Sequence, residues 1–285
     1  MQNCMNYSTT IHGQLNFALK RLHGIESARL DAELLLCLAI NTERTTVYSR
    51  PDQEIPQQQI DTFHTLVSKR SEGYPMAYIT GNKEFWSINL IVNEHTLIPR
   101  PETECLVERA LEKITPAKKV NIIDLGTGSG AIAIAIAKER PDCRIIATDN
   151  NAKALAIAAA NAKTYGLENI IFVKSDWFSV IDKQHFAFVV SNPPYVRHDD
   201  VHLQQGGIRF EPPQALIAGD DGLQAIRRII DQAPDYMAKD GWLLLEHGYD
   251  QGDAVRDLLS TCFSDVTTSL DYAGHERVTI ARYKS

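Results

Sequence analysis

The fold of this chain is decided by the stretch Lys119–Gly130, which has the sequence KVNIIDLGTGSG. Its first half is an apolar run rich in β-branched residues, which predicts a buried strand. The glycine turn 126–130 follows at once, and the alanine-rich run 131–138 after it predicts a helix. A strand, a glycine turn and a helix in this order are typical of an open α/β sheet. The free N–H groups at the start of such a helix attract an anion, which is worth ~0.3–2 kcal/mol.

Further runs with strand-like composition accompany this stretch. Those in the middle of the chain alternate with helical patterns, so the sheet is expected to be mostly parallel, with helices on both faces. The last two are separated by a short loop, which predicts an antiparallel closing pair. The predicted strands lie at residues 119–125, 144–148, 170–173, 186–190, 241–246, 264–270 and 277–283. The fold class is therefore α/β, with a mostly parallel, seven-stranded, Rossmann-like sheet.

Two side chains at predicted strand ends are candidates for nucleotide contact. Asp149 closes the second strand about 20 residues after the glycine turn, where an acidic residue binds ribose hydroxyls. The alternative is that one of residues 149–151 merely caps the next helix, and both roles are compatible. Trp177 follows the third strand beside Asp176, and a flat indole next to a carboxylate suits an adenine ring. Trp177 as an ordinary core residue has nearly equal weight.

The fourth predicted strand stops at Asn192–Tyr195, which has the sequence NPPY. Proline lacks the N–H that a strand ladder needs and fixes its own φ, so two prolines make a rigid end. Ligands of open α/β sheets lie at the carboxyl ends of the strands, which makes this tetrapeptide a candidate wall of an active site. The alternative is a proline-rich turn. The segment 196–222 is long enough to act as a lid or to contact a substrate.

Residues 1–72 predict a small helical domain. Apolar residues recur there at spacings of three to four, as in the stripe Leu30, Leu34 and Leu38, which is typical of amphipathic helices. No catalytic set is present, so the domain is expected to recognise or support a substrate.

Residues 73–100 predict a connector that contains a short strand or hairpin. At its end stands Arg100, between two prolines, where it is either a solvated residue or a ligand contact. The remaining residues, 101–285, form the expected catalytic domain.

Composition and charge narrow the class of protein. The chain has 285 residues, of which 44% are hydrophobic, and a net charge of -7, which disfavours a generally basic surface for nucleic acid. Its five cysteines are scattered and contain no C-x-x-C pair, which indicates a reducing compartment. No signal peptide is recognisable, and the longest apolar run near the start is too short to span a bilayer. We therefore expect a cytoplasmic protein without a membrane segment.

The order of these motifs resembles a class I methyltransferase that uses S-adenosylmethionine and methylates nitrogen. More narrowly, the chain resembles the release-factor glutamine methyltransferases of the HemK/PrmC family. The motifs that carry this resemblance are Tyr78–Gly81, Glu84–Trp86, Leu97–Glu104, Asp124–Gly130, Asn192–Tyr195, Arg209–Pro212 and Ala218–Gly222. The resemblance covers nearly the whole chain and implies N5-methylation of the glutamine in the GGQ loop of peptide chain release factors.

The resemblance also implies which residues hold the methyl donor. Asp149 would bind the ribose, Trp177 the adenine region, and Asn192 would lie next to both donor and acceptor. The methionine part of S-adenosylmethionine would contact the turn residues Gly126, Thr127, Gly128, Ser129 and Gly130. The sulfonium already supplies the leaving group, so neither a metal nor a covalent nucleophile is assigned.

For the acceptor, the resemblance implies that the side-chain carbonyl of Asn192 and the backbone carbonyl of Pro193 accept the two N–H groups of the glutamine amide. Two fixed acceptors would orient a poorly nucleophilic nitrogen for in-line attack, which is a positioning effect. Pro194 would stiffen this wall and Tyr195 would pack against the planar amide. Arg100 is the remaining candidate for substrate contact.

Three alternatives stay open. The first is a nucleic-acid N6-adenine methyltransferase, because the exocyclic NH2 of adenine must be oriented toward the methyl donor in the same way. The acidic net charge and the helical leader favour a protein substrate instead. An NAD-dependent oxidoreductase fits the glycine turn and leaves NPPY unexplained, and a non-catalytic scaffold could bind the cofactor. We expect release factors as partners, no direct contact with nucleic acid, and a monomer.

Overall fold

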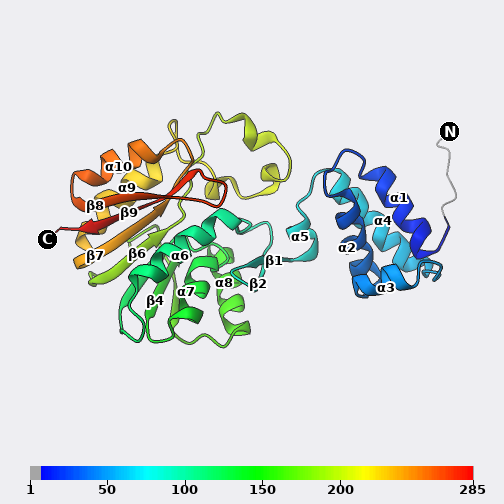
Figure 1. Cartoon of the computed structure of the whole chain (residues 1–285), viewed down its shortest axis with the longest axis horizontal. Helices are drawn as coiled ribbons and strands as arrows, with labels where there is room; N and C mark the ends of the chain where they lie inside the picture. Colours follow the sequence, from blue (N-terminus) through cyan, green and yellow to red (C-terminus); the bar gives the residue numbers. More distant parts are fainter. Residues whose placement is uncertain (1–7, 285) are drawn as a thin grey trace. The chain divides into compact units, whose positions relative to one another are not determined.

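A computed structural model describes residues 8–284 and divides them into two units. The helical unit comprises the described residues up to Gly81 together with Gln204–Phe210 (Figure 1). The sheet unit comprises Asn82–Leu203 and the described residues from Glu211 onward. The long segment after Tyr195 therefore contributes residues to both units.

The helical unit packs its helices around one apolar core. They are α1 (Ile11–Arg21), α2 (Ala28–Ile40), α3 (Arg44–Ser49), α4 (Gln57–Ser71) and α5 (Met76–Thr80), with a short 3-10 turn η3 (Ile208–Phe210). Among the helices of the described residues, none is long and apolar enough to traverse a lipid bilayer.

The stripe Leu30, Leu34 and Leu38 is not the buried face of α2, in contrast to the prediction. Leu30 and Leu38 are 43% and 45% exposed, whereas Ala32, Leu35 and Leu36 are fully buried.

Two acidic residues on the buried side of α2 account for this difference. Asp31 pairs with Arg70 at 2.6 Å, and Glu33 pairs with Arg44 at 2.7 Å. Because a buried charge is tolerated when it is paired, both carboxylates can face inward and turn the leucine stripe outward.

The sheet unit begins with a hairpin, as predicted for the connector. Strand β1 (Asn82–Phe85) pairs antiparallel with β2 (Ile88–Ile91). Asn161 ties this hairpin to the sheet, because its side chain bonds both polar groups of the Ile91 backbone and also donates to the Ser129 carbonyl.

The main sheet has seven strands in the order β5-β4-β3-β6-β7-β9-β8. The four pairings from β5 to β7 are parallel, and β9 is antiparallel to both β7 and β8. The predicted α/β fold class is thereby confirmed, including the antiparallel closing pair. The strands are β3 (Asn121–Leu125), β4 (Arg144–Asp149), β5 (Ile170–Lys174), β6 (Phe186–Ser191), β7 (Met237–Glu246), β8 (Phe263–Leu270) and β9 (Glu276–Tyr283).

Strand β7 begins at Met237, four residues before the predicted start at 241. Its pairing with β6 shifts register between Phe186 and Phe188, and Asp240 adopts a φ of 61°. The sequence Lys239-Asp240-Gly241 is typical of a turn, and the bulge lets the strand accommodate it.

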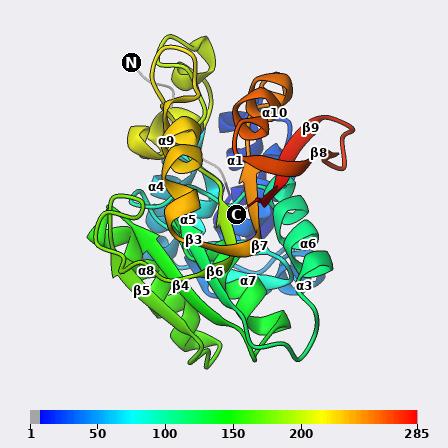
Figure 2. The same ribbon diagram turned by 90° about the vertical axis from the view of Figure 1, so that its left-hand side faces the viewer.

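Helices cover both faces of the sheet (Figures 1 and 2). One core joins Ile122 of β3 to α6 (Glu104–Lys113), α7 (Ala131–Glu139) and α8 (Ala152–Thr164). The other core joins Ile123 to α9 (Gln224–Gln232) and α10 (Gly252–Ser260). Successive residues of a strand point to opposite faces, so the apolar run of β3 supplies both layers.

Short 3-10 turns complete the connections of the chain. They are η1 (Pro101–Thr103), η2 (Val201–Gln204), η4 (Pro213–Ala215) and η5 (Ala233–Asp235). Of these, η1 leads directly into α6, so Pro101 starts a 3-10 turn and the α-helix follows it.

Candidate active site

The candidate site lies at the carboxyl ends of three adjacent parallel strands. Strand β3 pairs with β4 on one side and with β6 on the other, so the chain leaves the sheet in opposite directions from this point. Such a switch point opens a crevice for a ligand. The Ser191 hydroxyl donates to the Leu125 carbonyl at 2.7 Å and thereby fixes the end of β6 against the end of β3.

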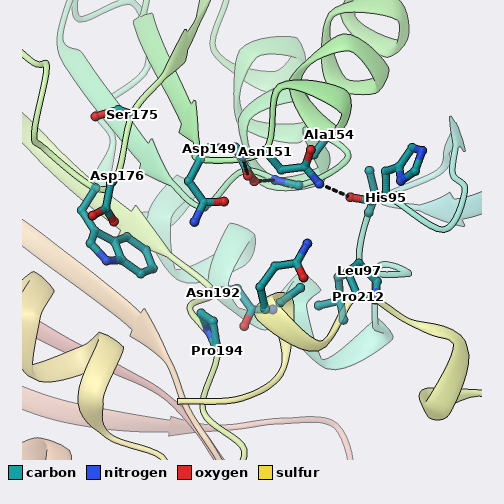
Figure 3. A pocket seen from close by; sticks show the side chains of 17 residues that line it. His95, Leu97, Asp149, Asn151, Ala154, Ser175, Asp176, Asn192, Pro194 and Pro212 are labelled. Atoms are coloured by element: carbon teal, nitrogen blue, oxygen red, sulfur yellow. Dashed lines mark hydrogen bonds between the residues drawn. The ribbon is translucent and has the colours of Figure 1, made fainter. Parts of the chain in front are cut away.

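A cleft opens there, between residues that follow these strand ends. Figure 3 shows Asp149 and Asn151 facing Asn192 and Pro194 across it. Residues predicted as site residues that line it are Gly126, Gly128, Asp149, Trp177, Asn192 and Pro194. Further lining residues come from 95–97, 150–154, 175–176 and 212–215.

Backbone and side-chain contacts with the end of β4 hold the glycine turn in place. The Thr127 N–H donates to the Thr148 carbonyl at 2.8 Å, and the Gly128 N–H donates to Asp149 Oδ2 at 2.9 Å. Gly126 has a φ of 72°, and a Cβ placed on it would come within 3.5 Å of the Trp177 ring. The turn thus keeps an open backbone surface directly beside the indole. Thr127 and Ser129 are buried behind it.

Asp149 is fixed by backbone donors at both oxygens. Besides the Gly128 contact, its Oδ1 accepts the Asn151 N–H at 2.8 Å. Burial raises the pKa of Asp149, while these N–H groups act to lower it. Asn151 is the N-cap of α8 and accepts the Lys153 N–H at 3.0 Å. Each carboxylate oxygen has a second lone pair, so Asp149 can accept further hydrogen bonds from a ligand.

Trp177 lines the cleft in an unusual backbone conformation. Its φ is 53°, in the left-handed region that bulky residues rarely occupy, and its side chain is half-buried against the core that contains α9. Strain of this kind persists where the surroundings hold it and is concentrated at functional sites. Trp177 therefore combines a packing contact with a face turned to the cleft.

The NPPY tetrapeptide is anchored at both ends. The Asn192 Nδ2 atom donates to the Thr103 hydroxyl at 3.0 Å, and the Tyr195 hydroxyl donates to Glu246 Oε1 at 3.3 Å. Burial raises the pKa of Tyr195, and the Glu246 carboxylate raises it further, so the phenol stays protonated. Gln251 Nε2 also donates to the Tyr195 carbonyl at 3.0 Å. These contacts leave the oxygen end of the Asn192 amide for a ligand.

Three predicted substrate contacts lie outside the cleft lining. Pro193 is buried, and the Tyr195 hydroxyl points to Glu246. Arg100 forms an ion pair with Glu211, whose other oxygen accepts the Ile98 N–H at 3.0 Å. The Arg209–Pro212 motif thus supplies a carboxylate that fixes residues 98–100 at the edge of the cleft.

Sequence reasoning assigned no role to the buried polar residues below the site. Asp124 is fully buried and accepts the Thr127 hydroxyl at 2.6 Å, and burial raises its pKa to about 7. Its Oδ1 has no hydrogen-bond partner among the residues that the structure describes. Thr103 and Glu246 support the tetrapeptide in a similar way. Glu246 could have been noticed as a charged residue that ends an apolar strand, whereas Thr103 carries no such signal.

The segment 196–222, which we predicted to be a lid or a substrate contact, closes on itself at its base. The Val196 N–H donates to the Leu216 carbonyl at 2.8 Å, and the Ala218 N–H donates to the Val196 carbonyl at 2.9 Å. Its residues Pro212, Gln214 and Ala215 line the cleft, so the segment forms one side of it.

Comparison with known proteins shows a close likeness to methyltransferases. Family models match residues 102–209 (methyltransferase small domain) and 15–81 (PrmC N-terminal domain). The release factor glutamine methyltransferase of Escherichia coli K12 is 46% identical over 94% of this chain and 97% of its own length. That of Vibrio cholerae is 43% identical over 98% of both chains.

A solved structure shows the same fold at low identity. The 16S rRNA N2 G1207 methyltransferase of T. thermophilus, in complex with AdoMet and guanosine, has a TM-score of 0.51 and 15% identity. The match covers 71% of this chain and 50% of that one.

Replacing Gly222 tests how tightly the tetrapeptide is supported. Gly222 has a φ of 75°, and a Cβ on it would lie 2.4 Å from the Tyr195 carbonyl oxygen. We expect Gly222→Ala to lower the free energy of unfolding by about 3 kcal/mol, from backbone strain plus overpacking. Urea unfolding measures this loss.

Gly219→Ala is the matched control, because its φ is 77° but its Cβ would meet only the flexible side chain of Gln224. It should cost about 1 kcal/mol, the strain alone. Equal losses in the two variants would contradict the contact with Tyr195.

Proposed function

The chain belongs to the release factor glutamine methyltransferase family, and we propose that it transfers a methyl group from S-adenosylmethionine to the N5 nitrogen of a glutamine in a peptide chain release factor. The observation that carries this proposal is the identity of 43–47% to relatives so named, over 89–98% of this chain. The position of Asn192 in the cleft, opposite Asp149, supports it. A release factor as substrate implies that the reaction takes place in the cytoplasm.

The cleft fits S-adenosylmethionine by the chemistry of its residues. Asp149 offers carboxylate oxygens to ribose hydroxyls, Trp177 offers an aromatic face to adenine, and the glycine turn leaves backbone N–H and space for the methionine end. When bound, the donor supplies a methyl group on a positively charged sulfonium. The turn residues that would hold the methionine end are Gly126, Thr127, Gly128, Ser129 and Gly130.

The low reactivity of the acceptor nitrogen accounts for the role that we assign to the NPPY tetrapeptide. An amide nitrogen is a poor nucleophile because its lone pair is delocalised, so its position and orientation matter more than its reactivity. With Nδ2 of Asn192 held by Thr103, the side-chain oxygen is free to accept one N–H of the glutamine amide. The Pro193 carbonyl would accept the other, and Tyr195 would contact the amide plane. Arg100, held by Glu211, would border the incoming loop.

A labelling experiment separates this proposal from its alternatives. The protein is incubated with S-adenosylmethionine labelled in the methyl group and, separately, with a release factor, duplex DNA and ribosomal RNA. We expect label only on the release factor, at a glutamine of the GGQ loop located by mass spectrometry. Label on nucleic acid alone would refute the proposal, and binding of the donor without any transfer would indicate a scaffold.

Asn192→Ala tests the acceptor role. The variant should bind S-adenosylmethionine with nearly unchanged Kd, while kcat falls by on the order of 100–1,000-fold, as for loss of one positioned polar group. Asn89→Ala, which replaces an exposed asparagine of β2, should change neither quantity. Near-normal turnover of the Asn192 variant would exclude the assigned role.

We further propose that the helical unit contributes to recognition of the release factor. The α2 patch, Leu30, Leu34 and Leu38, gives it an outward apolar stripe that its own core does not use. Replacing Leu30 and Leu38 with serine should raise KM for the release factor about 5- to 20-fold, from lost apolar burial, and leave kcat within 2-fold. Val180→Ser, at a 61% exposed position of the sheet unit, is the control. An unchanged KM in the double variant would contradict this role.

A further inference from the structure

The side chain of Asn161 joins three segments of the sheet unit. Asn161 belongs to α8, is 1% exposed and lies outside the lining of the cleft. Its Oδ1 accepts the Ile91 N–H at 2.7 Å, and its Nδ2 donates to the Ile91 carbonyl at 3.0 Å and to the Ser129 carbonyl at 2.9 Å. Both N–H groups of the amide are therefore used, and one of them reaches the glycine turn.

These partners fix the direction in which the Asn161 amide faces. Two carbonyl oxygens need donors and one backbone N–H needs an acceptor, and an amide supplies all three only in the observed orientation. If the amide turned over, its oxygen would lie against two carbonyl oxygens. A buried polar group without a matching partner is unfavourable, so the observed orientation is the stable one. An aspartate has nearly the same shape but lacks the two N–H groups.

Asn161 shares the task of holding the hairpin with a second side chain of the same helix. The hydroxyl of Tyr165, the C-cap residue of α8, accepts the Asn89 N–H and donates to the Asn89 carbonyl, each at 2.9 Å. Asn161 and Tyr165 are four residues apart, so they face strand β2 from one side of α8 (Figure 1). Asn161 differs by its additional bond to Ser129. Anchoring of the hairpin does not account for that bond.

The peptide bond between Ser129 and Gly130 is held at both of its polar groups. Its carbonyl oxygen accepts from Asn161, and the Gly130 N–H donates to the Thr127 carbonyl at 2.8 Å. Gly130 has a φ of 85°, and a Cβ on it would lie 3.1 Å from the Cβ of Ala158 on α8. Ala158 and Asn161 are three residues apart. One face of α8 therefore both packs against the glycine turn and forms a hydrogen bond with it.

The direction of the Ser129 carbonyl matters for an anionic ligand. The methionine end of S-adenosylmethionine carries a carboxylate, which the backbone N–H groups at the start of a helix attract. A carbonyl oxygen turned toward that carboxylate would place a partial negative charge against it. Because Asn161 draws the Ser129 oxygen toward α8, the glycine turn keeps the polarity that a carboxylate requires.

We propose that Asn161 is a positioning residue for the methyl donor, which holds the Ser129–Gly130 peptide so that the glycine turn can receive the methionine end. This assignment rests on the proposed function, because it concerns the donor of that reaction. The adenosine end of the donor is assigned to Asp149 and Trp177. An effect that acts through Asn161 should therefore be confined to the methionine end.

Two ligands that differ at the methionine end test this role by titration calorimetry of the full-length protein. S-adenosylhomocysteine carries the amino-acid group, whereas 5′-methylthioadenosine has the same adenosine and sulfur without it. Asn161→Asp keeps the acceptor for the Ile91 N–H and loses the donors to Ser129 and Ile91. It should raise the Kd of S-adenosylhomocysteine about 10- to 100-fold, as for loss of one hydrogen bond to a charged group, and that of 5′-methylthioadenosine by less than about 2-fold.

Tyr165→Phe is the matched control, because it keeps the ring and removes only the hydroxyl that holds Asn89. It should change neither Kd by more than about 2-fold, since the glycine turn keeps its support. A general disturbance of the fold would raise both Kd values of the Asn161 variant by the same factor. That result, or an unchanged affinity for both ligands, would overturn the proposal. Asn161→Ala gives the same comparison where thermal unfolding shows that the aspartate variant does not fold.

A second measurement uses the unsubstituted protein and needs no variant. The side-chain NH2 protons of Asn161, observed by NMR of protein labelled with 15N asparagine, should exchange with water more slowly when S-adenosylhomocysteine saturates the cleft. Saturation with 5′-methylthioadenosine should leave the exchange rate unchanged, because that ligand does not reach the glycine turn. Equal slowing by both ligands would overturn the role of Asn161 alone. A wild-type protein that binds neither ligand would instead refute the donor site, and the proposed function with it.

Discussion

The parallel pairing of β3 with both β4 and β6 is the constraint on which the rest of the structure depends. It brings the ends of three strands together, and with them the glycine turn, Asp149 and the NPPY tetrapeptide. A sheet that placed these strands elsewhere would leave each motif without its partner. The Ser191 contact to Leu125 shows how directly the two central strand ends are joined. Donor and acceptor groups can meet because the topology, not a local loop, sets their separation.

Much of this fold could be predicted from the sequence because the strands are short, apolar and followed by glycine, proline or acidic residues. The pattern failed where long-range contacts outweighed local composition. In α2, Asp31 and Glu33 face inward, where Arg70 of α4 and Arg44 of α3 pair with them. Arg29, four residues before Glu33, is a local partner of Glu33, but the pairing with α3 and α4 could not be predicted from the pattern of α2. In β7, the polar residues before Gly241 are typical of a turn, and the bulge opposite Phe186 lets the strand continue through them.

The residues of the candidate site likewise fall into those that the sequence could predict and those that depend on long-range contacts. Residues at strand ends, such as Asp149 and Asn192, could be predicted because topology brings strand ends together. Thr103 could not, since it belongs to a turn 89 positions away from Asn192 and meets it only in the folded protein. Arg100 was a candidate for its position between two prolines, and its pairing with Glu211 shows a structural reason for a cation there. Supporting residues therefore need the three-dimensional structure, even where the groups they support do not.

Both halves of the cleft are supported by a buried carboxyl group, and burial of these groups lowers the stability of the fold. The glycine turn rests on Asp124 and the tetrapeptide on Glu246, each a buried carboxyl group with a hydroxyl donor from the turn above it. In both, burial raises the pKa to about 7. The unfolded chain releases these protons near its ordinary carboxyl pKa, so between about pH 4 and 7 the folded state binds more protons, and stability falls as the pH rises. Above about pH 7 both carboxyl groups are ionised in the folded and the unfolded state, and the full loss of stability from burying them remains. A fold under selection for stability alone would replace these groups, and their position directly beneath the cleft indicates that the cost is retained to orient polar groups for the ligand.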